Sequence, residues 1–413
     1  MNRLPPDAAA ASRSRERALL ALLAFNFGAI FLDRNALTLL MPFVAPDLGL
    51  LNTQIGLLSS GIALMWAISG YALTAFAERR LTSRSLLIAL TLLAAFTTLL
   101  TGFAHTFAVL FMLRLASGVF AGPVLPISQA VVAVAAPSHH RGLQMGLMQS
   151  FGSSLMASVL APTALISIAL AVGWRAALWS SALVGLLSVL LMWCFLSIPP
   201  GSAPQATPVA RPAPPRIRQL LANRNVRLCN LISIGMIGWL IVGLTFYPLY
   251  LVRELHLSSE QMGFAMGTLG ISAMTGSVLV PYLSDRMGRK PIVVGFALIG
   301  AVAPVLMLLA HPGAWAAGGL LLISGLAGST LPVFMSTIPA ESLGLHGAAP
   351  AVGLIQGVGE GLGGVLMPFL AGVLADRFSL RAPLIVLTCS ALGVAIVALA
   401  LQETAPAITR ARR

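Results

Sequence analysis

Charged side chains are scarce in this chain of 413 residues. Asp, Glu, Lys and Arg together make up 9%, and only 12 residues are acidic. Hydrophobic residues account for 58%, and the mean hydropathy is +0.92. Because a soluble domain carries about 25% charged residues, this composition excludes a soluble protein. It indicates a chain that crosses a membrane many times.

Cysteine is rare as well. Cys194, Cys229 and Cys389 lie in or beside apolar segments, without CxxC or metal-ligand spacing, which argues against a disulfide framework and a cysteine-held metal. The sequence also lacks a phosphate-binding loop, a metal constellation and a nucleophile–base arrangement. We therefore expect neither an enzyme nor a cofactor other than a coupling ion.

Long apolar runs are what the chain has in abundance. About twenty apolar residues span a bilayer, and the sequence offers about twelve such runs. We predict an all-α membrane protein with twelve transmembrane helices in two six-helix bundles. The expected parts are an N-terminal tail (1–17), a first bundle (18–198), a linker (199–225), a second bundle (226–401) and a C-terminal tail (402–413). The linker is rich in Pro and Ala, a composition typical of an extended connection.

The net charge of +13 reflects an uneven distribution of arginine. Most basic residues fall in the N-terminal tail, the linker, the C-terminus and loops on the same side of the membrane, whereas Arg175, Arg253, Arg377 and Arg381 lie opposite. This positive-inside pattern predicts that both termini and the linker are cytoplasmic. It explains the charge without nucleic-acid binding. We expect a monomer in the inner membrane of a bacterium, with the lipid bilayer and a small molecule as its partners.

The two halves of the sequence repeat each other. The same offset relates three sets of residues: Gln54 and Gly56 to Gln261 and Gly263, Glu78-Arg79 to Asp285-Arg286, and Gln149 and Gly152 to Gln356 and Gly359. Each half contains an even number of predicted spans, so the halves share one orientation. Such parallel repeats are typical of one large class of transporters.

Three charges lie inside predicted spans of the first half: Asp33, Arg34 and Arg114. Charges at membrane depth are costly and mark functional sites. Neighbours on a helix point about 100° apart, so Asp33 can pair with Arg114 while Arg34 faces a cavity. Two arginines against one aspartate leave a positive excess, which an anion would complement. The alternative is a static Asp33–Arg114 pair that joins two helices.

Glu360 is the charge inside the second half, on a glycine-rich predicted helix. It is a candidate for proton coupling or for contact with a substrate hydroxyl, and a neutral packing residue is the alternative. Gln149, Gln356 and Tyr247 are further candidates for substrate contact. The glutamines are equally compatible with hydrogen bonds between helices, and the tyrosine with an aromatic belt.

Residues 281–290 resemble the signature loop of the major facilitator superfamily, G-x-L-x-D-R-x-G-R-K. Asp285, Arg286, Gly288 and Arg289 match it, and the first-half copy keeps only Glu78 and Arg79. The resemblance implies the major facilitator fold. It also implies a gating role for these residues, since a carboxylate here can bind arginines and a helix N-terminus.

The first half resembles one branch more closely, the anion:cation symporters of the galactonate, hexuronate and sialic-acid type. The matching residues are Leu32-Asp33-Arg34 and Arg114, followed by Gly118, Gly122 and Pro123. The resemblance implies that Arg34 contacts the substrate carboxylate, that Asp33 takes a proton, and that Arg114 pairs with acidic groups. Many relatives carry a glutamate where this chain has Ala121, so Asp33 alone, or Glu360 in addition, would carry the coupling.

The predicted function is proton-coupled uptake of a small organic anion, a carboxylate such as a sugar acid. The alternative is a proton-coupled exporter of drugs or metabolites. Many drug antiporters carry Gly-x3-Gly-Pro in the fifth helix, where this chain has Ala157, Ala161 and Pro162, which argues against export. A membrane enzyme and a transport-derived sensor are the remote alternatives.

Overall fold

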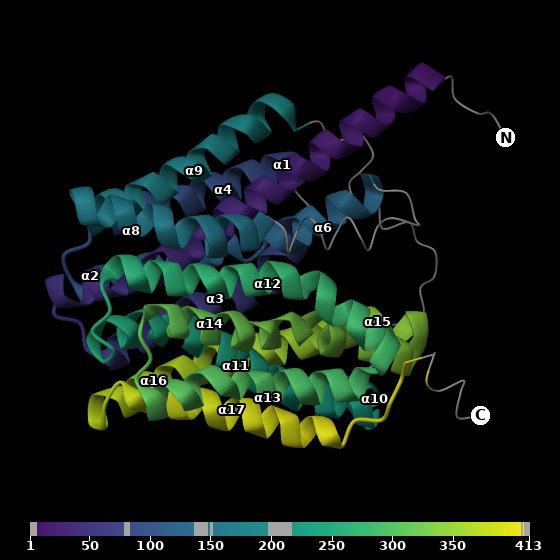
Figure 1. Ribbon diagram of the computed structural model, residues 1–413. Coiled ribbons are helices and arrows are strands. Elements are labelled where there is room, and N and C mark those ends of the chain that lie inside the picture. The colour runs from purple at the N-terminus through teal and green to yellow at the C-terminus, as the bar shows by residue number, and fades with distance from the viewer. Residues whose placement is uncertain are drawn as a thin grey trace.

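The structure, a computed structural model, describes residues 6–77, 83–135, 148, 152–196, 217–405 and 408. Within these residues, twelve helical stretches are long and apolar enough to cross a membrane, and no strand is present. Figure 1 shows the helices of the first half, coloured purple to blue-teal, packed as a bundle beside those of the second half, coloured teal to yellow. The predicted all-α class and the two six-helix bundles are confirmed.

The first bundle contains nine elements that the structure describes. They are α1 (Pro6–Leu39), α2 (Met41–Asp47), α3 (Asn52–Ala77), α4 (Ser83–Thr101), α5 (Phe107–Ala121), α6 (Val124–Ala135), the π-helix η2 (Ser154–Leu160), α8 (Ala161–Val172) and α9 (Trp174–Phe195).

The second half begins with the short helix α10 (Ile217–Ala222). It continues with α11 (Arg224–Arg253), α12 (Ser259–Met287), α13 (Arg289–Ala310), α14 (Ala314–Gly325), the 3-10 helix η3 (Leu326–Thr330), the π-helix η4 (Val333–Thr337), α15 (Ile338–Val358), the π-helix η5 (Gly359–Gly364), α16 (Val365–Arg377) and α17 (Arg381–Leu399).

Helix boundaries differ from the sequence prediction in several places, most clearly near the N-terminus and in the linker. Helix α1 starts at Pro6, inside the predicted tail, and stops at Leu39 before the separate helix α2. Pro42 lies in the first turn of α2, where the missing N–H costs nothing. In the predicted linker, 199–216 lie outside the described residues, and the remainder forms α10 and the start of α11.

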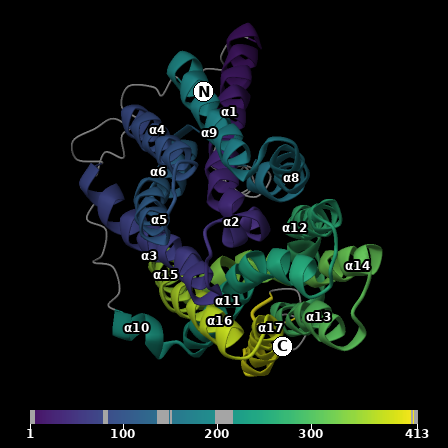
Figure 2. The same ribbon diagram turned by 90° about the vertical axis from the view of Figure 1, so that its left-hand side faces the viewer.

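At the end of the molecule that carries α2, the two bundles are packed tightly through α3 and α16, which lie side by side in Figure 2. A Cβ atom added to Gly56 would lie 2.3 Å from the Pro368 carbonyl oxygen, and one added to Gly372 would lie 2.4 Å from that of Asn52. The backbones approach so closely only because these residues are glycine.

The same contact is capped by a carboxylate. Asp376 of α16 accepts hydrogen bonds from the backbone N–H groups of Asn52 at 2.8 Å and Thr53 at 2.7 Å, at the N-terminus of α3. A carboxylate in this position satisfies free N–H groups and complements the helix dipole. The bundles are therefore joined at this end.

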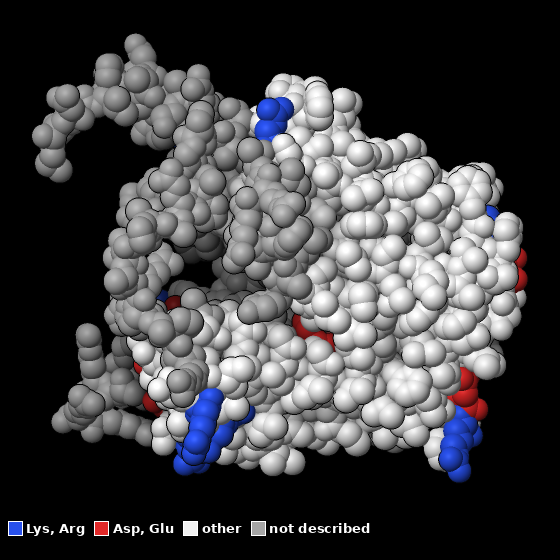
Figure 3. Space-filling model, turned by 180° about the vertical axis from the view of Figure 1, so that it is seen from behind, with Lys and Arg blue, Asp and Glu red and all other residues white. Residues whose placement is uncertain are grey.

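Figure 1 shows both termini at the opposite end of the molecule. In Figure 3, Lys, Arg, Asp and Glu of the described residues gather mainly at the two ends of the molecule, and the broad band between them is white except for one acidic patch. Such a band matches the hydrocarbon layer of a bilayer.

Candidate functional site

Arg34 of α1 lies at the centre of the interface between the bundles. Its Nη2 is 3.6 Å from Glu360 Oε2 in η5, and both side chains are largely buried, with 13% and 16% of their surface exposed. The guanidinium also lies over Trp66 of α3, with its carbon 4.5 Å from the ring centroid, and 5.7 Å from that of Phe31. Both distances are within the range of cation–π attraction. Arg34 is thus held from two sides, by two aromatic residues of its own bundle and by Glu360 of the other.

Asp33 points in a different direction from Arg34, as the predicted 100° separation requires. It is 4% exposed and packs against α9, where a Cβ atom added to Gly185 would lie 3.4 Å from its Oδ2. The hydroxyl groups of Thr98 and Ser181 are its polar neighbours. Within the described part of the chain, neither carboxylate oxygen has a hydrogen-bond partner. Asp33 therefore lies inside the first bundle, away from Glu360.

Arg114 of α5 is the cationic neighbour of Asp33, and it is 6% exposed. Its Nη1 donates a hydrogen bond of 3.2 Å to the backbone carbonyl of Arg34. Among the described residues it makes no contact ion pair with Asp33, so the predicted direct pairing is replaced by a longer-range attraction. Asp33, Arg114 and Arg34 thus form one group, in which a change of charge on one residue changes the electrostatic energy of the others.

A cavity of about 590 Å³ lies between the bundles with Arg34 and Glu360 in its wall. Gln356, a predicted substrate contact, lines the cavity, together with Trp66, Asn35 and Gln129. Among the described lining residues Arg34 is the one cation and Glu360 the one acid. The side chains of Asn35 and Gln356 make no hydrogen bond with another described residue, so both can serve a ligand.

Other predicted contacts do not reach this cavity. Tyr247 is 1% exposed, packs against Gly243 within the second bundle and does not line the cavity. A Cβ atom added to Gly243, one turn before Tyr247, would meet both Tyr247 and Leu387 of α17, which places this face of α11 in the core of the second bundle. Gln149 lies outside the described residues. Ala121, at the position where relatives carry a glutamate, is 3% exposed in α5.

Irregular helix segments line the space between the bundles. Four of them contribute lining residues: η2, η3, η4 and η5, the last of which carries Glu360. At membrane depth, backbone without regular α-helical bonds is tolerated where it is buried in protein or lines a cavity, and π-bulges are frequent at functional sites. The glycine-rich sequence around Glu360 is the signal that pointed to this segment.

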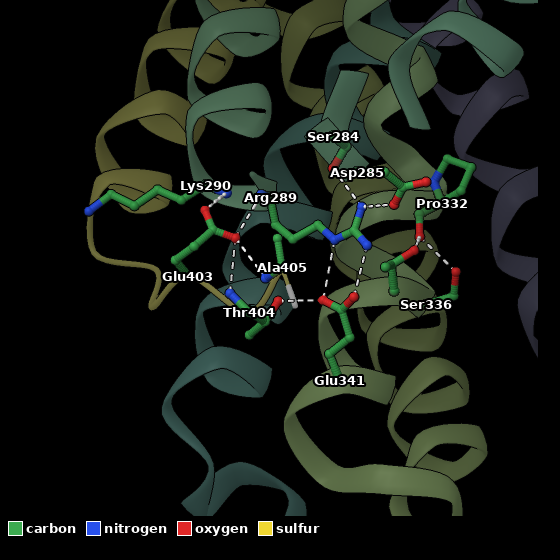
Figure 4. Close-up of polar contacts among 11 residues, drawn as sticks. Ser284, Asp285, Arg289, Lys290, Pro332, Ser336, Glu341, Glu403, Thr404 and Ala405 are labelled. Atoms are coloured by element: carbon green, nitrogen blue, oxygen red, sulfur yellow. Dashed lines mark hydrogen bonds and ion pairs between the residues drawn. The ribbon is translucent and has the colours of Figure 1, made fainter. Parts of the chain in front are cut away.

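The predicted gating loop forms a polar cluster at the end that carries the termini (Figure 4). Arg289, at the start of α13, pairs with Asp285 and, at 2.8 Å, with Glu341 of α15. Gly288 has a φ of +106°, a conformation that favours glycine. Arg286 lies over the Tyr282 ring at 4.4 Å instead of joining this cluster. Glu78 and Arg79, the first-half copy, lie outside the described residues.

The C-terminal segment completes this cluster, which the sequence did not predict. The Glu403 carboxylate accepts hydrogen bonds from the backbone N–H groups of Arg289 at 2.8 Å and Lys290 at 3.1 Å. Burial raises the pKa of Glu403, but these bonds and those from Ala405 and Thr404 outweigh it, so the pKa lies below its usual value. The C-terminal segment thus binds the predicted gating loop within the second bundle.

Comparison with known proteins agrees with this architecture. The sequence matches the Major Facilitator Superfamily over residues 23–359 and 244–412. A probable sulfoacetate transporter of Cupriavidus necator is 25% identical, with 87% of each chain covered. A D-galactonate transporter of Escherichia coli is 24% identical, covering 93% of this chain and 95% of its own. A quinolone resistance protein, NorA, of Staphylococcus aureus is also 24% identical, covering 93% and 97%.

Solved structures agree at the level of the fold. A bacterial homologue of the human lysosomal transporter Spinster, in an inward-facing and occupied conformation, superimposes with a TM-score of 0.75 at 16% identity, covering 92% of this chain and 95% of that one. The chain has twelve spans in two bundles, a cavity between them and a sequence match over most of its length. It therefore belongs to the Major Facilitator Superfamily and is a membrane transporter.

Proposed function

We propose that the protein is a proton-coupled symporter that takes up a small organic anion, with a carboxylate as the group it recognises. The observation that carries this proposal is the Arg34–Glu360 contact inside the central cavity. Arg34 is the natural anchor for a carboxylate because its guanidinium can bind two oxygens at once. Glu360 occupies that anchor while no substrate is present.

The charges around the cavity favour coupling to protons. Asp33 and Glu360 together balance Arg34 and Arg114, so the deprotonated site has no excess charge to attract an anion. Protonation of either acid leaves one positive charge uncompensated in a largely buried site. An anion would then neutralise it, and by reciprocity a bound anion favours protonation. Positive coupling of this sign is what symport requires.

The two acids have different roles in this proposal. Glu360 competes with the substrate directly, because both bind the Arg34 guanidinium. Asp33 acts through Arg114, which also holds the Arg34 backbone carbonyl. Asp33 is the main proton carrier, with two buried carboxylate oxygens that lack partners among the described residues. Glu360 takes over the role of the carboxylate that is missing at Ala121.

Alternating access uses the two ends of the bundle interface. With the termini in the cytoplasm of a bacterial cell, as the arginine distribution suggests, the central cavity lies on the cytoplasmic side of the α3–α16 contact, because its wall includes Ser59 and Trp66 of α3 but not Asn52 or Gly56. Packing of α3 on α16 then closes the outer side. Separation of these helices, together with closure around Asp285, Arg286, Gly288 and Arg289 at the inner side, would give the outward-facing state. Glu78 and Arg79 would take part from the first bundle.

A counterflow assay in proteoliposomes tests the anchor. Carboxylates that stabilise the purified protein against thermal unfolding are identified first, since a bound ligand stabilises the fold by mass action. Arg34→Ala should then abolish counterflow of those carboxylates. Arg84→Ala should retain it, because Arg84 lies at the start of α4 and does not line the cavity. Counterflow by Arg34→Ala at the wild-type rate would overturn the anchor assignment.

Export is the second candidate, favoured by the similarity to NorA and by the many apolar residues in the cavity wall. In a proton-coupled exporter, proton and substrate compete for the site. Substrate binding would then weaken as the pH falls, whereas the symporter predicts tighter binding. The pH dependence of binding to detergent-solubilised protein distinguishes the two without knowledge of the orientation in the membrane.

A further inference from the structure

Two layers of polar side chains cross the interior of the first bundle, where α1 and α4 pack on α9. In the layer nearer the termini, the Asn26 amide oxygen accepts hydrogen bonds from the hydroxyl groups of Thr91 at 3.0 Å and Ser188 at 2.9 Å. All three residues of this Asn26 layer are fully buried. One hydroxyl from α4 and one from α9 therefore converge on a single side-chain oxygen of α1.

The Asp33 layer repeats this arrangement. Asp33 of α1 and Thr98 of α4 lie seven residues after their counterparts in the Asn26 layer, and Ser181 of α9, which runs the other way, lies seven residues before its own. Seven residues are about two helical turns, so the same helix faces are used. Both hydroxyl groups lie beside the carboxylate, but its oxygens accept no hydrogen bond from the described chain. Ser181 donates instead to the backbone carbonyl of Leu178 at 2.9 Å.

The second bundle has the same helix packing without these layers. There α11 and α13 pack on α17, as α1 and α4 pack on α9 in the first bundle. The corresponding positions, all at one offset in the sequence, are buried and apolar: Ile232, Trp239, Ala297, Pro304, Leu387 and Val394. Three helices can therefore pack in this way without hydroxyl groups. The hydroxyls of the Asp33 layer occur only in the bundle that carries the acid.

The charges near Asp33 come from other directions. Arg114 of α5 faces the carboxylate, and Arg34 is next in the chain. Of the other elements packed on α1, η2, α6 and α8 carry no titratable side chain, and α11 meets α1 at the central cavity, on the side of Arg34. The titratable residues of α2, α4 and α9 lie at helix ends: Asp47, Arg84, Arg175 and Cys194. On the α4–α9 side, the hydroxyls of Thr98 and Ser181 are thus the groups that can respond to the charge of Asp33.

We propose that Thr98 and Ser181 are positioning residues for the proton on Asp33. When Asp33 is ionised, both hydroxyls turn and donate to its carboxylate, in the geometry of the Asn26 layer. When Asp33 is protonated, Ser181 donates to the Leu178 carbonyl, its partner in the structure. Hydrogen bonds to an ionised group are about twice as strong as neutral ones, so the two hydroxyls favour proton release from a site that burial alone would keep neutral. The inference rests on the proposed function, which takes Asp33 as the proton carrier.

An infrared titration of the full-length protein in lipid follows the proton on Asp33 without any ligand. In each background, the carboxylic acid band that Asp33→Asn removes is recorded as a function of pH, and its midpoint is the pH at which Asp33 is half protonated. The double variant Thr98→Val with Ser181→Ala should raise this midpoint by about one pH unit or more, because hydrogen bonds that favour the ionised form are lost. An unchanged or lower midpoint would overturn the inference.

The Asn26 layer supplies the matched control. Thr91→Val with Ser188→Ala makes the same two changes on the same helices and removes two hydrogen bonds that the structure contains. This pair should lower thermal stability and leave the midpoint of Asp33 unchanged. An equal rise in both double variants would mean that the midpoint follows the packing of the bundle, and the positioning role would be wrong.

Single variants provide the test if the double variant does not fold. Ser181→Ala and Thr98→Val should each give part of the rise in midpoint. Thr98→Ser keeps the hydroxyl and should titrate like the wild type. A midpoint that is unchanged in both Ser181→Ala and Thr98→Val, or that rises as much in Thr98→Ser as in Thr98→Val, would overturn the inference.

The titration also separates this inference from the proposed function. If the midpoint is the same in all variants, while carboxylates bind and Asp33→Asn abolishes proton-driven accumulation, the coupling role of Asp33 stands and the positioning role of the hydroxyls is wrong. If Asp33→Asn removes no band at any pH at which the wild-type protein is folded, Asp33 does not carry the proton. Its role in the proposed function and this inference then fail together.

Discussion

Neutralising Glu360 is the perturbation that addresses the coupling most specifically. In the structure its Oε2 lies 3.6 Å from Arg34 Nη2. At that separation and an effective dielectric of about 20, opposite unit charges attract by roughly 4 to 5 kcal/mol. Desolvation and the ordering of both side chains oppose this attraction, which leaves a net contact of about 1 to 3 kcal/mol. A substrate carboxylate must overcome this contact before it can bind Arg34.

Glu360→Gln removes that competition and keeps the side-chain shape. The variant should therefore bind carboxylates more tightly than the wild type near neutral pH, by about tenfold, since 1.4 kcal/mol corresponds to one order of magnitude. Its affinity should also depend less on pH, because one of the two acids that link protons to anion binding has been removed. Isothermal titration of a carboxylate at several pH values measures both quantities.

The control is Gln356→Ala, which removes an uncharged side chain from the wall of the same cavity. It should leave the pH dependence of anion affinity unchanged, whatever it does to the affinity itself. If Glu360→Gln binds carboxylates more weakly than the wild type and keeps the full pH dependence, Glu360 contacts the substrate instead of competing with it. The reasoning about Arg34 would then be refuted.

Three further predictions concern other parts of the molecule. Asp33→Asn should lose proton-driven accumulation in proteoliposomes while retaining part of substrate exchange; unchanged accumulation would contradict its role as proton carrier. Gly372→Leu would place its Cβ 2.4 Å from the Asn52 carbonyl oxygen, so α3 and α16 should no longer pack together. Transport should then fall about tenfold or more, with carboxylate binding retained. Transport at the wild-type rate would show that this contact is not needed. The lowered pKa of Glu403 means that its stabilisation is present above the ordinary glutamate pKa of 4.5 and is lost as the pH falls through the folded-state value. Glu403→Gln should therefore lose about 1 kcal/mol of stability near neutral pH and approach the wild type under more acidic conditions, as followed by thermal unfolding; an equal deficit at both pH values would contradict this.

Much of the fold could be predicted from the sequence because each transmembrane helix of a membrane protein is a long apolar run. The bilayer thickness fixes the length of each apolar run, and the repeated residues around Gln54 and Gln261 reveal two equivalent bundles. Helix ends were less predictable. Pro42 lies in the first turn of the separate helix α2, and the helical character of residues 6–17 and of α10 has no apolar signal.

The candidate site could be predicted only in part. The angle between adjacent side chains correctly separates Asp33 from Arg34. The positive excess inferred around Arg34 was incomplete, because Glu360 comes from the other bundle and its contact depends on how the bundles meet. Sequence patterns report which residues share a helix face, but they do not report which faces of distant helices come together.

In the predicted gating loop, too, the sequence motif identifies some of the interacting residues but not their partners from other segments. The motif contains both Asp285 and Arg289, which pair in the structure. Glu341 and Glu403, which hold Arg289 and its backbone from other segments, lie outside the motif and carry no pattern of their own. Acidic residues are rare in this chain, and that rarity is the one signal that could have marked them as partners for the loop arginine.

If one site couples an anion to a proton, carboxylate entry must carry protons with it. Proteoliposomes containing a trapped pH-sensitive dye are mixed with a carboxylate that binds the protein, in the absence of any imposed pH gradient. We expect acidification of the lumen that requires Arg34 and is lost in Asp33→Asn. Carboxylate entry without acidification, or acidification that is unchanged in Arg34→Ala, would contradict this coupling.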